Sequence, residues 1–104
     1  MEIVDKVYEI VPFLPKEEKY GISSQMTRSA IAIPSNIAEG SAKRSEKDYI
    51  RFVEISFGSS FELEPHSLVV KKRKWIEERI INELLEMLTR EQKMLSKFIE
   101  KLGG

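Results

Sequence analysis

The stretch SEKDYIRFVEISFGSSF, residues 45–61, decides the fold class, because it reads as a helix with a capped start and an apolar body. Ser45 is followed three residues later by Asp48, which resembles a capping box with Asp in place of Glu. Six of the nine residues from 49 to 57 are apolar, which predicts burial on more than one side. Contact with other copies of the chain would supply that burial, and so would a central place in an ordinary bundle core.

A first and a last helix flank this stretch. Apolar residues three and four apart predict a helix over residues 3–14, and Pro12 and Pro15 end it. A heptad seam predicts the last helix from about Glu77 to Leu102, interrupted only by Glu91. The apolar positions of that seam are Ile81, Leu84, Leu88, Leu95, Phe98 and Leu102.

A second helix precedes the deciding stretch. Ser23 or Ser24 is expected to act as its N-cap, and Gly40 to end it as glycines often do. Pro34 lies well inside and is expected to kink this helix without abolishing it. The apolar stripe of the second helix is Ile22, Met26, Ala30, Ile33 and Ile37.

Strand signals are absent from the sequence, which has no Asn-Gly turn and no alternating run of β-branched residues. Long amphipathic helices joined by short connections favour antiparallel neighbours. The sequence therefore predicts an all-α fold, an antiparallel up-down four-helix bundle, with residues 1–104 forming a single domain.

Composition limits the classes of function. The 17 basic residues balance the 17 acidic ones, so contact with nucleic acid would have to come from local patches. The chain has no cysteine, which excludes disulfides and thiolate chemistry. No apolar run approaches the ~20 residues of a membrane span, and the start of the chain lacks the apolar region of a signal peptide. A cytoplasmic protein without membrane contact is expected.

Enzyme chemistry finds no support in the sequence. His66 is the only histidine, and a zinc site or a nucleophile relay needs partners that the chain does not have. The acidic pairs at residues 17–18 and 77–78 stand at expected helix starts, where they favour the helix dipole. No Glu-x-x-His motif of a di-metal bundle and no phosphate-cradling glycine loop occurs. We therefore expect no catalytic residue, no cofactor, no metal, no small-molecule substrate and no enzyme activity.

Polar residues repeat along the two middle helices. If the turn centres near residues 43–44, antiparallel pairing places Arg28 opposite Ser59 and Glu62. The same pairing places Asn36 and Glu39 near Arg51. The favoured interpretation is a hydrogen-bonded, partly buried network that fixes helix register. The alternative is a polar stripe that lines a ligand groove or an RNA contact.

Two basic clusters remain as candidate nucleic-acid contacts, and an antiparallel bundle places them at opposite ends. The first basic cluster is Lys43, Arg44, Lys47 and Arg51, and the second basic cluster is Lys71, Lys72, Arg73 and Lys74. Cations at a helix end also complement its dipole, which would explain the second cluster without a ligand. Only Tyr49 and Trp75 stand near enough to stack on bases, and Trp75 is expected to close the bundle end instead.

The chain also resembles a known family. The stretch PKEEKYGISSQMTRSAIAIPSNIAEG, residues 15–40, resembles the signature of bacterial four-helix bundle proteins encoded in intervening sequences of 23S ribosomal RNA genes. The stretch RFVEISFGSSFELE, residues 51–64, continues the likeness. The family is related to the accessory protein of diversity-generating retroelements, which binds nucleic acid. The resemblance implies an antiparallel four-helix bundle that assembles into a ring, commonly a pentamer.

Two departures from the family pattern bear on the expectations. The Arg-Arg pair typical of the second helix is Thr27-Arg28 here, which removes one positive charge. Pro65 stands where the family continues a helix, so the third helix is expected to be irregular there.

Two functions follow from the sequence. One is a self-assembling bundle that associates with structured RNA through basic rim residues, and the other is an oligomeric scaffold that binds protein and no nucleic acid.

Overall fold

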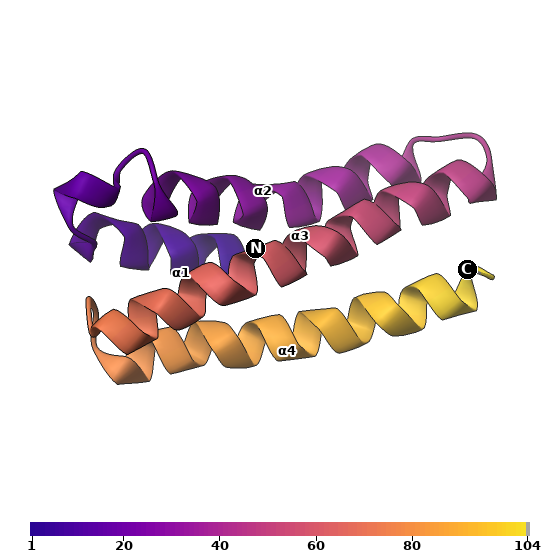
Figure 1. The fold of residues 1–104 in the computed structure, drawn as a ribbon. Helices are drawn as coiled ribbons and strands as arrows, with labels where there is room; N and C mark the ends of the chain where they lie inside the picture. Colours follow the sequence, from indigo (N-terminus) through magenta and orange to yellow (C-terminus); the bar gives the residue numbers. More distant parts are fainter. Residues whose placement is uncertain (104) are drawn as a thin grey trace.

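The computed structural model of the chain describes residues 1–103. In this part of the chain the elements are α1 (Glu2–Ile10), the 3₁₀ turns η1 (Val11–Phe13) and η2 (Lys16–Glu18), α2 (Ile22–Ser41), α3 (Glu46–Arg73) and α4 (Glu78–Lys101). Successive helices run in opposite directions (Figure 1). The predicted all-α, antiparallel four-helix bundle is confirmed.

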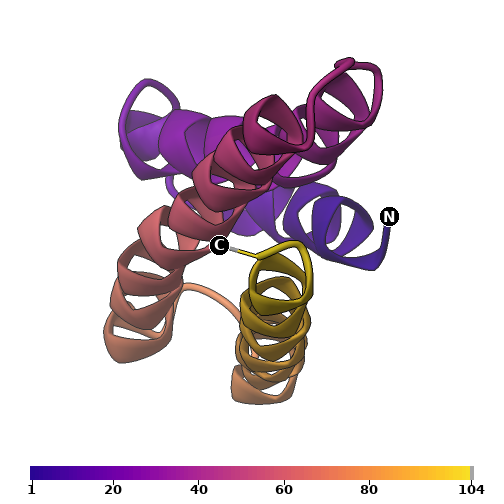
Figure 2. The ribbon, with the colours of Figure 1, turned by 90° about the vertical axis from the view of Figure 1, so that its right-hand side faces the viewer.

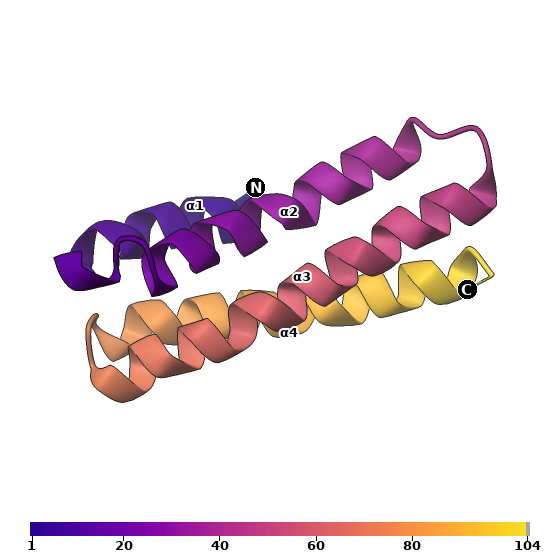
Figure 3. The same ribbon diagram turned by 45° about the horizontal axis from the view of Figure 1, so that its top comes forward.

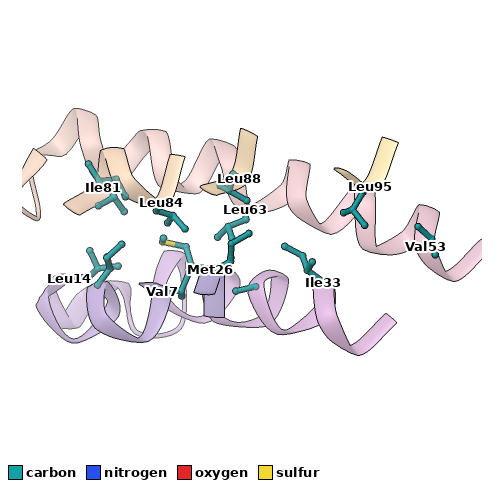
Figure 4. Close-up of a cluster of buried hydrophobic side chains, with 14 residues drawn as sticks. Val7, Leu14, Met26, Ile33, Val53, Leu63, Ile81, Leu84, Leu88 and Leu95 are labelled. Carbon is teal, nitrogen blue, oxygen red and sulfur yellow. The ribbon is translucent and has the colours of Figure 1, made fainter. Parts of the chain in front are cut away.

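The core lies between two layers of helices. One layer is the pair α1 and α2, and the other is the pair α3 and α4 (Figure 3). Apolar side chains from all four helices fill the space between the layers (Figure 4). The heptad seam predicted for α4 faces this core, and its fully or nearly fully buried members are Ile81, Leu84, Leu88 and Leu95.

The first helix is much shorter than the others. It has 9 residues against 28 in α3, and it ends before Pro12, which lies in η1. As a result, α1 covers only the half of the bundle that lies away from the α2–α3 turn (Figure 1). Figure 2 looks toward the other half, where the α2–α3 turn and the end of α4 face the viewer.

The start of α2 differs from the prediction. Gly21 is its N-cap residue, with no side-chain capping bond, whereas Ser23 and Ser24 lie inside the first turn. Ser23 is buried there, so its place on the core-facing side outweighs its capping preference. Helix α2 continues unbroken through Pro34.

The end of α2 also differs. Helix α2 runs to Ser41, so Gly40 does not end it as predicted. Gly40 is instead buried against α3, where an added Cβ would lie 2.7 Å from Cβ of Phe52 and 3.0 Å from Cδ1 of Tyr49. The glycine is required because the two helix backbones approach closely, and its conformational freedom is not used.

Substitution of Gly40 by alanine is expected to destabilise the fold by about 1–3 kcal/mol, because the new methyl group overlaps the base of the Phe52 side chain. The matched control is Ser96→Ala on α4, where the side chain is exposed and alanine is the better helix former. That change should leave stability unchanged or slightly higher. Urea unfolding followed by circular dichroism measures both, and equal stabilities would contradict the close approach at Gly40.

Helix α3 begins as predicted and is longer than its proline suggests. Ser45 is the N-cap, and its Oγ accepts a hydrogen bond from the Asp48 backbone N–H at 3.1 Å. The expected irregularity at Pro65 is wrong, because α3 continues through it to Arg73. Pro65 is exposed, and so is Phe61, the residue four positions earlier whose carbonyl loses its N–H partner. After α3, Trp75 is half-buried and packs against the core.

Candidate nucleic-acid interface

The two basic clusters lie at opposite ends of a bundle that is 43 Å long. The first cluster occupies the α2–α3 turn and the start of α3, and the second occupies the end of α3 (Figure 1). Within residues 1–103, no side chain of either cluster forms an ion pair within 4.0 Å. Their charges are therefore available to an external anion.

The local structure explains only part of the first basic cluster, since Lys43 and Arg44 follow the C-terminal end of α2, where the helix dipole favours cations. All four of its side chains are exposed, and the Nζ of Lys43 lies 5.1 Å from the ring centroid of Phe52. Lys47 and Arg51 stand four residues apart, so they project from one side of α3. Lys47 lies in the first turn of α3, where the helix dipole disfavours a cation. The α3 dipole therefore does not account for Lys47, whose charge is open to an external anion.

Acidic residues share the same end of the molecule. Glu46, Asp48 and Glu54 line a shallow hollow together with Lys47 and Arg51. The carboxylates at the first turn of α3 stabilise its N-terminus, and they also lower the local positive potential. Any contact with phosphates here is therefore expected to be weak.

The second basic cluster has a structural explanation. Lys71, Lys72 and Arg73 form the last turn of α3, where cations complement the negative end of the helix dipole. Lys74 follows in the left-handed conformation, with φ of 57°, and its backbone N–H donates to the Lys71 carbonyl. These cations need no ligand to account for them.

The aromatic residues near the clusters are committed to packing. The Tyr49 ring lies edge-to-face against Phe98, with centroids 5.6 Å apart. Trp75 packs against the core at the other end. Neither ring is presented for stacking on a base, so the geometry suits phosphates and not base identity.

The predicted polar network is only partly assembled. Arg28, Ser59 and Glu62 do line one pocket of about 440 Å³ between α2 and α3. Among residues 1–103, however, no ion pair joins Arg28 to Glu62 or Glu39 to Arg51. All four charged side chains are exposed, so water competes for them and the gain from pairing is small.

The remaining polar members of that network bond to their own helices. Ser59 Oγ donates to the Ile55 carbonyl at 3.1 Å, and Asn36 Nδ2 donates to the Ala32 carbonyl at 2.8 Å. Local acceptors one turn away outcompete the other helix. The prediction of a hydrogen-bonded network across the hairpin through these residues is therefore wrong.

Other polar contacts, which the sequence did not indicate, join α2 to α3. Ser56 Oγ donates to the Ile33 carbonyl at 2.7 Å, inside the core. His66 Nε2 lies 2.7 Å from Oε1 of Gln25, which lines the pocket shared by Arg28 and Glu62. The only histidine is thus a bridge between helices. No spacing rule could have found these contacts, because each pairs residues of different types on different helices.

An ion pair that the sequence did not indicate ties α1 to α4. Lys6 Nζ donates to Glu83 Oε2 at 2.7 Å and also lies 3.2 Å from Glu9. The hydrogen bond between Lys6 and Glu83 raises the pKa of Lys6 and lowers the pKa of Glu83. Both charged forms therefore persist across neutral pH and help to hold the short first helix in place.

Glu91, which interrupts the α4 seam, is half-buried beside Ile33 and Met87, and this burial raises its pKa. A raised carboxyl pKa lowers stability once pH rises through it, because the folded chain then holds a poorly hydrated charge. We expect Glu91→Gln to stabilise the protein at pH 7, by less than about 1 kcal/mol. This gain in stability should vanish at pH values below the ordinary glutamate pKa, where the glutamate of the parent is as neutral as the glutamine of the variant. Thermal unfolding across pH tests this, with exposed Glu86→Gln as the control.

Residues 1–103 offer neither a metal site nor a membrane-spanning helix. No group of three or more histidine, aspartate or glutamate side chains is placed to hold a metal ion in this range. No helix in the described part of the chain is long and apolar enough to cross a membrane.

Comparison with known proteins finds a family whose model matches the chain and a solved structure that the chain resembles. The sequence profile described as "23S rRNA-intervening sequence protein" matches residues 1–97. Among solved structures, the chain is similar to a protein with unknown function from the S23 ribosomal protein family of Bacteroides thetaiotaomicron. The two share 25% identity with a TM-score of 0.77, over 93% of this chain and 97% of the other. Comparison with curated proteins gives no significant match.

Proposed function

Because the chain belongs to the 23S rRNA-intervening sequence protein family, we propose that it is a self-assembling, non-enzymatic bundle that associates with structured RNA through its basic ends. The descriptions of the family and of the Bacteroides protein do not point to catalysis. The observation that carries the proposal is the first basic cluster. It presents four exposed cations at one end of the bundle, without ion-pair partners within residues 1–103.

Assembly would make this contact stronger than one copy allows. A single cluster of four cations diluted by neighbouring carboxylates makes few phosphate contacts. Several copies arranged around an axis would repeat the cluster around one rim, and weak contacts would become multivalent. The pentamer that the family resemblance implies would offer five such clusters.

A second candidate function is an oligomeric scaffold for protein partners. The balance of 17 basic and 17 acidic residues favours it, since a neutral chain attracts polyanions weakly. Exposed apolar side chains on α3, among them Phe61 and Leu68, also suit a protein contact.

A binding titration against a structured RNA hairpin at several salt concentrations separates the two functions. With about four phosphate contacts, affinity should fall roughly 1,000-fold for a tenfold rise in salt. Hairpins of unrelated sequence should bind alike, because phosphates carry no base identity. No binding at the lowest salt would refute the RNA function and leave the scaffold function.

A further inference from the structure

The outward face of α2 carries charges at its two ends and small or apolar residues between them. Arg28, Ile31, Ser35 and Glu39 follow one another at spacings of three, four and four, so they share one side of the helix. All four are exposed. The face reads positive, apolar, small and then negative along the chain.

The outward face of α3 has the same order. Arg51, Ile55, Gly58 and Glu62 follow at spacings of four, three and four and also share one side of their helix. Ile55 is 43% exposed although it is a large apolar residue. This face too reads positive, apolar, small and then negative.

The hydrogen bond between Ser56 and the Ile33 carbonyl sets the register of the two helices within one chain. Ile31 stands two residues before Ile33, and Gly58 two residues after Ser56, so antiparallel helices bring Ile31 and Gly58 to one level.

The charged residues match in the same way. The contact between Gln25 and His66 brings Arg28 to the level of Glu62, and both line the same pocket. Glu39 lies six residues after Ile33, and Arg51 lies five residues before Ser56. Because the helices are antiparallel, Glu39 and Arg51 are also at one level. Each positive residue of one face is therefore level with a negative residue of the other.

We propose that copies of this chain contact one another head to tail, with the outward face of α2 in one copy packed on the outward face of α3 in the next. Copies related by rotation about an axis parallel to the bundle stay at the same height, so the register within the hairpin is reproduced between copies. Arg28 then pairs with Glu62 of the next copy, and Glu39 with its Arg51. In the assembly, Lys43, Arg44 and Lys47 of the first basic cluster remain open to RNA. A contact of this kind uses two different faces, and it closes into a ring where the rotation from copy to copy divides a full turn.

Gly58 supplies an independent argument for a close neighbour. A glycine inside an exposed helix destabilises it relative to alanine, and within the chain an added Cβ at Gly58 meets nothing within 4 Å. The chain itself therefore gives no reason for a glycine there, in contrast to Gly40. In the proposed contact, Ile31 of one copy lies over Gly58 of the next, as a knob over the space that a missing side chain leaves.

A second copy fits these faces better than a nucleic acid does. Each face has one arginine and one glutamate, so a polyanion gains nothing overall. The α2 face supplies the charge opposite to that of the α3 face at both matched levels, and the same chain always carries both faces. This contact deepens the self-assembly proposed above and does not depend on RNA binding.

The test is the solution mass of two charge-reversal variants, alone and mixed. Arg28→Glu and Glu62→Arg should each raise the concentration needed for assembly at least about 100-fold, because like charges then face each other. An equimolar mixture should recover assembly, since the α2 face of each variant complements the α3 face of the other. In a ring with an odd number of copies one contact stays mismatched, so recovery there is substantial but incomplete.

Mixing also separates a contact between copies from one within a chain, because a pair within one chain cannot be repaired by mixing. Glu39→Arg and Arg51→Glu form an independent second set if either first variant fails to fold. The same loss and recovery of mass are expected for that set, because these two residues meet at the other matched level of the contact.

A steric test uses Gly58. Gly58→Leu should dissociate the assembly, whereas Ser96→Leu on the exposed side of α4 should not.

Three results would each overturn the contact: a monomeric parent chain, single variants with the parent's mass, or a mixture that stays dissociated. Titration of the same samples with RNA keeps the two proposals apart. If the mixture recovers the mass of the assembly but does not bind RNA, the contact between copies is retained and the RNA function is rejected. If the parent chain is a monomer that binds RNA, the RNA function is retained and the contact is rejected.

Discussion

Replacement of Lys43, Arg44 and Lys47 together by glutamate is expected to lower RNA affinity at least about 100-fold at low salt. Three cations that would each neutralise a phosphate become three anions that repel it. The fold should be retained, because all three side chains are exposed and without ion pairs in residues 1–103, and only the contact of Lys43 with the Phe52 ring is lost. At position 47 the change should help the helix, because glutamate suits the first turn of α3. Electrophoretic mobility or fluorescence anisotropy measures the affinity.

The comparison variant reverses Lys71, Lys72 and Arg73 at the other end. Its effect on RNA affinity should be smaller, because the dipole of α3 already accounts for these cations. Solution mass and helix content are measured for both variants, so that loss of assembly is not mistaken for loss of a contact. RNA binding by both variants at the strength of the parent would show that neither basic end is the interface.

The fold was predictable because its signals are local. Ser45 followed by Asp48 marked the start of α3 to the residue, and the bond from Asp48 to Ser45 is present. The α4 seam was visible because leucine and isoleucine recur at heptad spacing, and those side chains face the core. Such patterns depend only on residues within one or two turns of each other.

Errors arose where a residue's role depends on a second helix. Gly40 looks like a helix end in sequence, but the closeness of Phe52 across the hairpin is what requires it. Sequence spacing correctly brought Arg28 and Glu62 to one pocket, yet it could not give the distance between their side chains. Small side chains line that pocket between the two charged residues, among them Ser29, Ala32 and Ser59.

The two basic clusters show the same limit for the prediction of functional residues from sequence. Their positions at the two ends follow from the antiparallel order alone, and the sequence predicted them. The difference between them appears only with the helix ends in place. Lys47 then stands where the dipole opposes it, and Lys71, Lys72 and Arg73 stand where the dipole favours them.

Truncation of Leu84 to alanine is expected to destabilise the protein by about 3 kcal/mol, within the usual range for a buried leucine. Leu84 is fully buried on α4, between the two helix layers (Figure 4). The loss combines the transfer of its lost methyl groups with the cavity that they leave. Domains of this size are commonly stable by about 5–15 kcal/mol, so one such change removes a large share.

The matched control is Leu68→Ala on α3, where the same side chain is 48% exposed. It should cost less than about 1 kcal/mol, because a surface leucine loses little packing. Urea midpoints of both variants, measured at one protein concentration, give the comparison. Equal losses would mean that another copy buries Leu68 as deeply as the core buries Leu84. The two layers are joined chiefly by the packing of α2 on α3, and α4 reaches α1 only over the short length of that helix. Leu84 belongs to the buried core to which all four helices contribute (Figure 4).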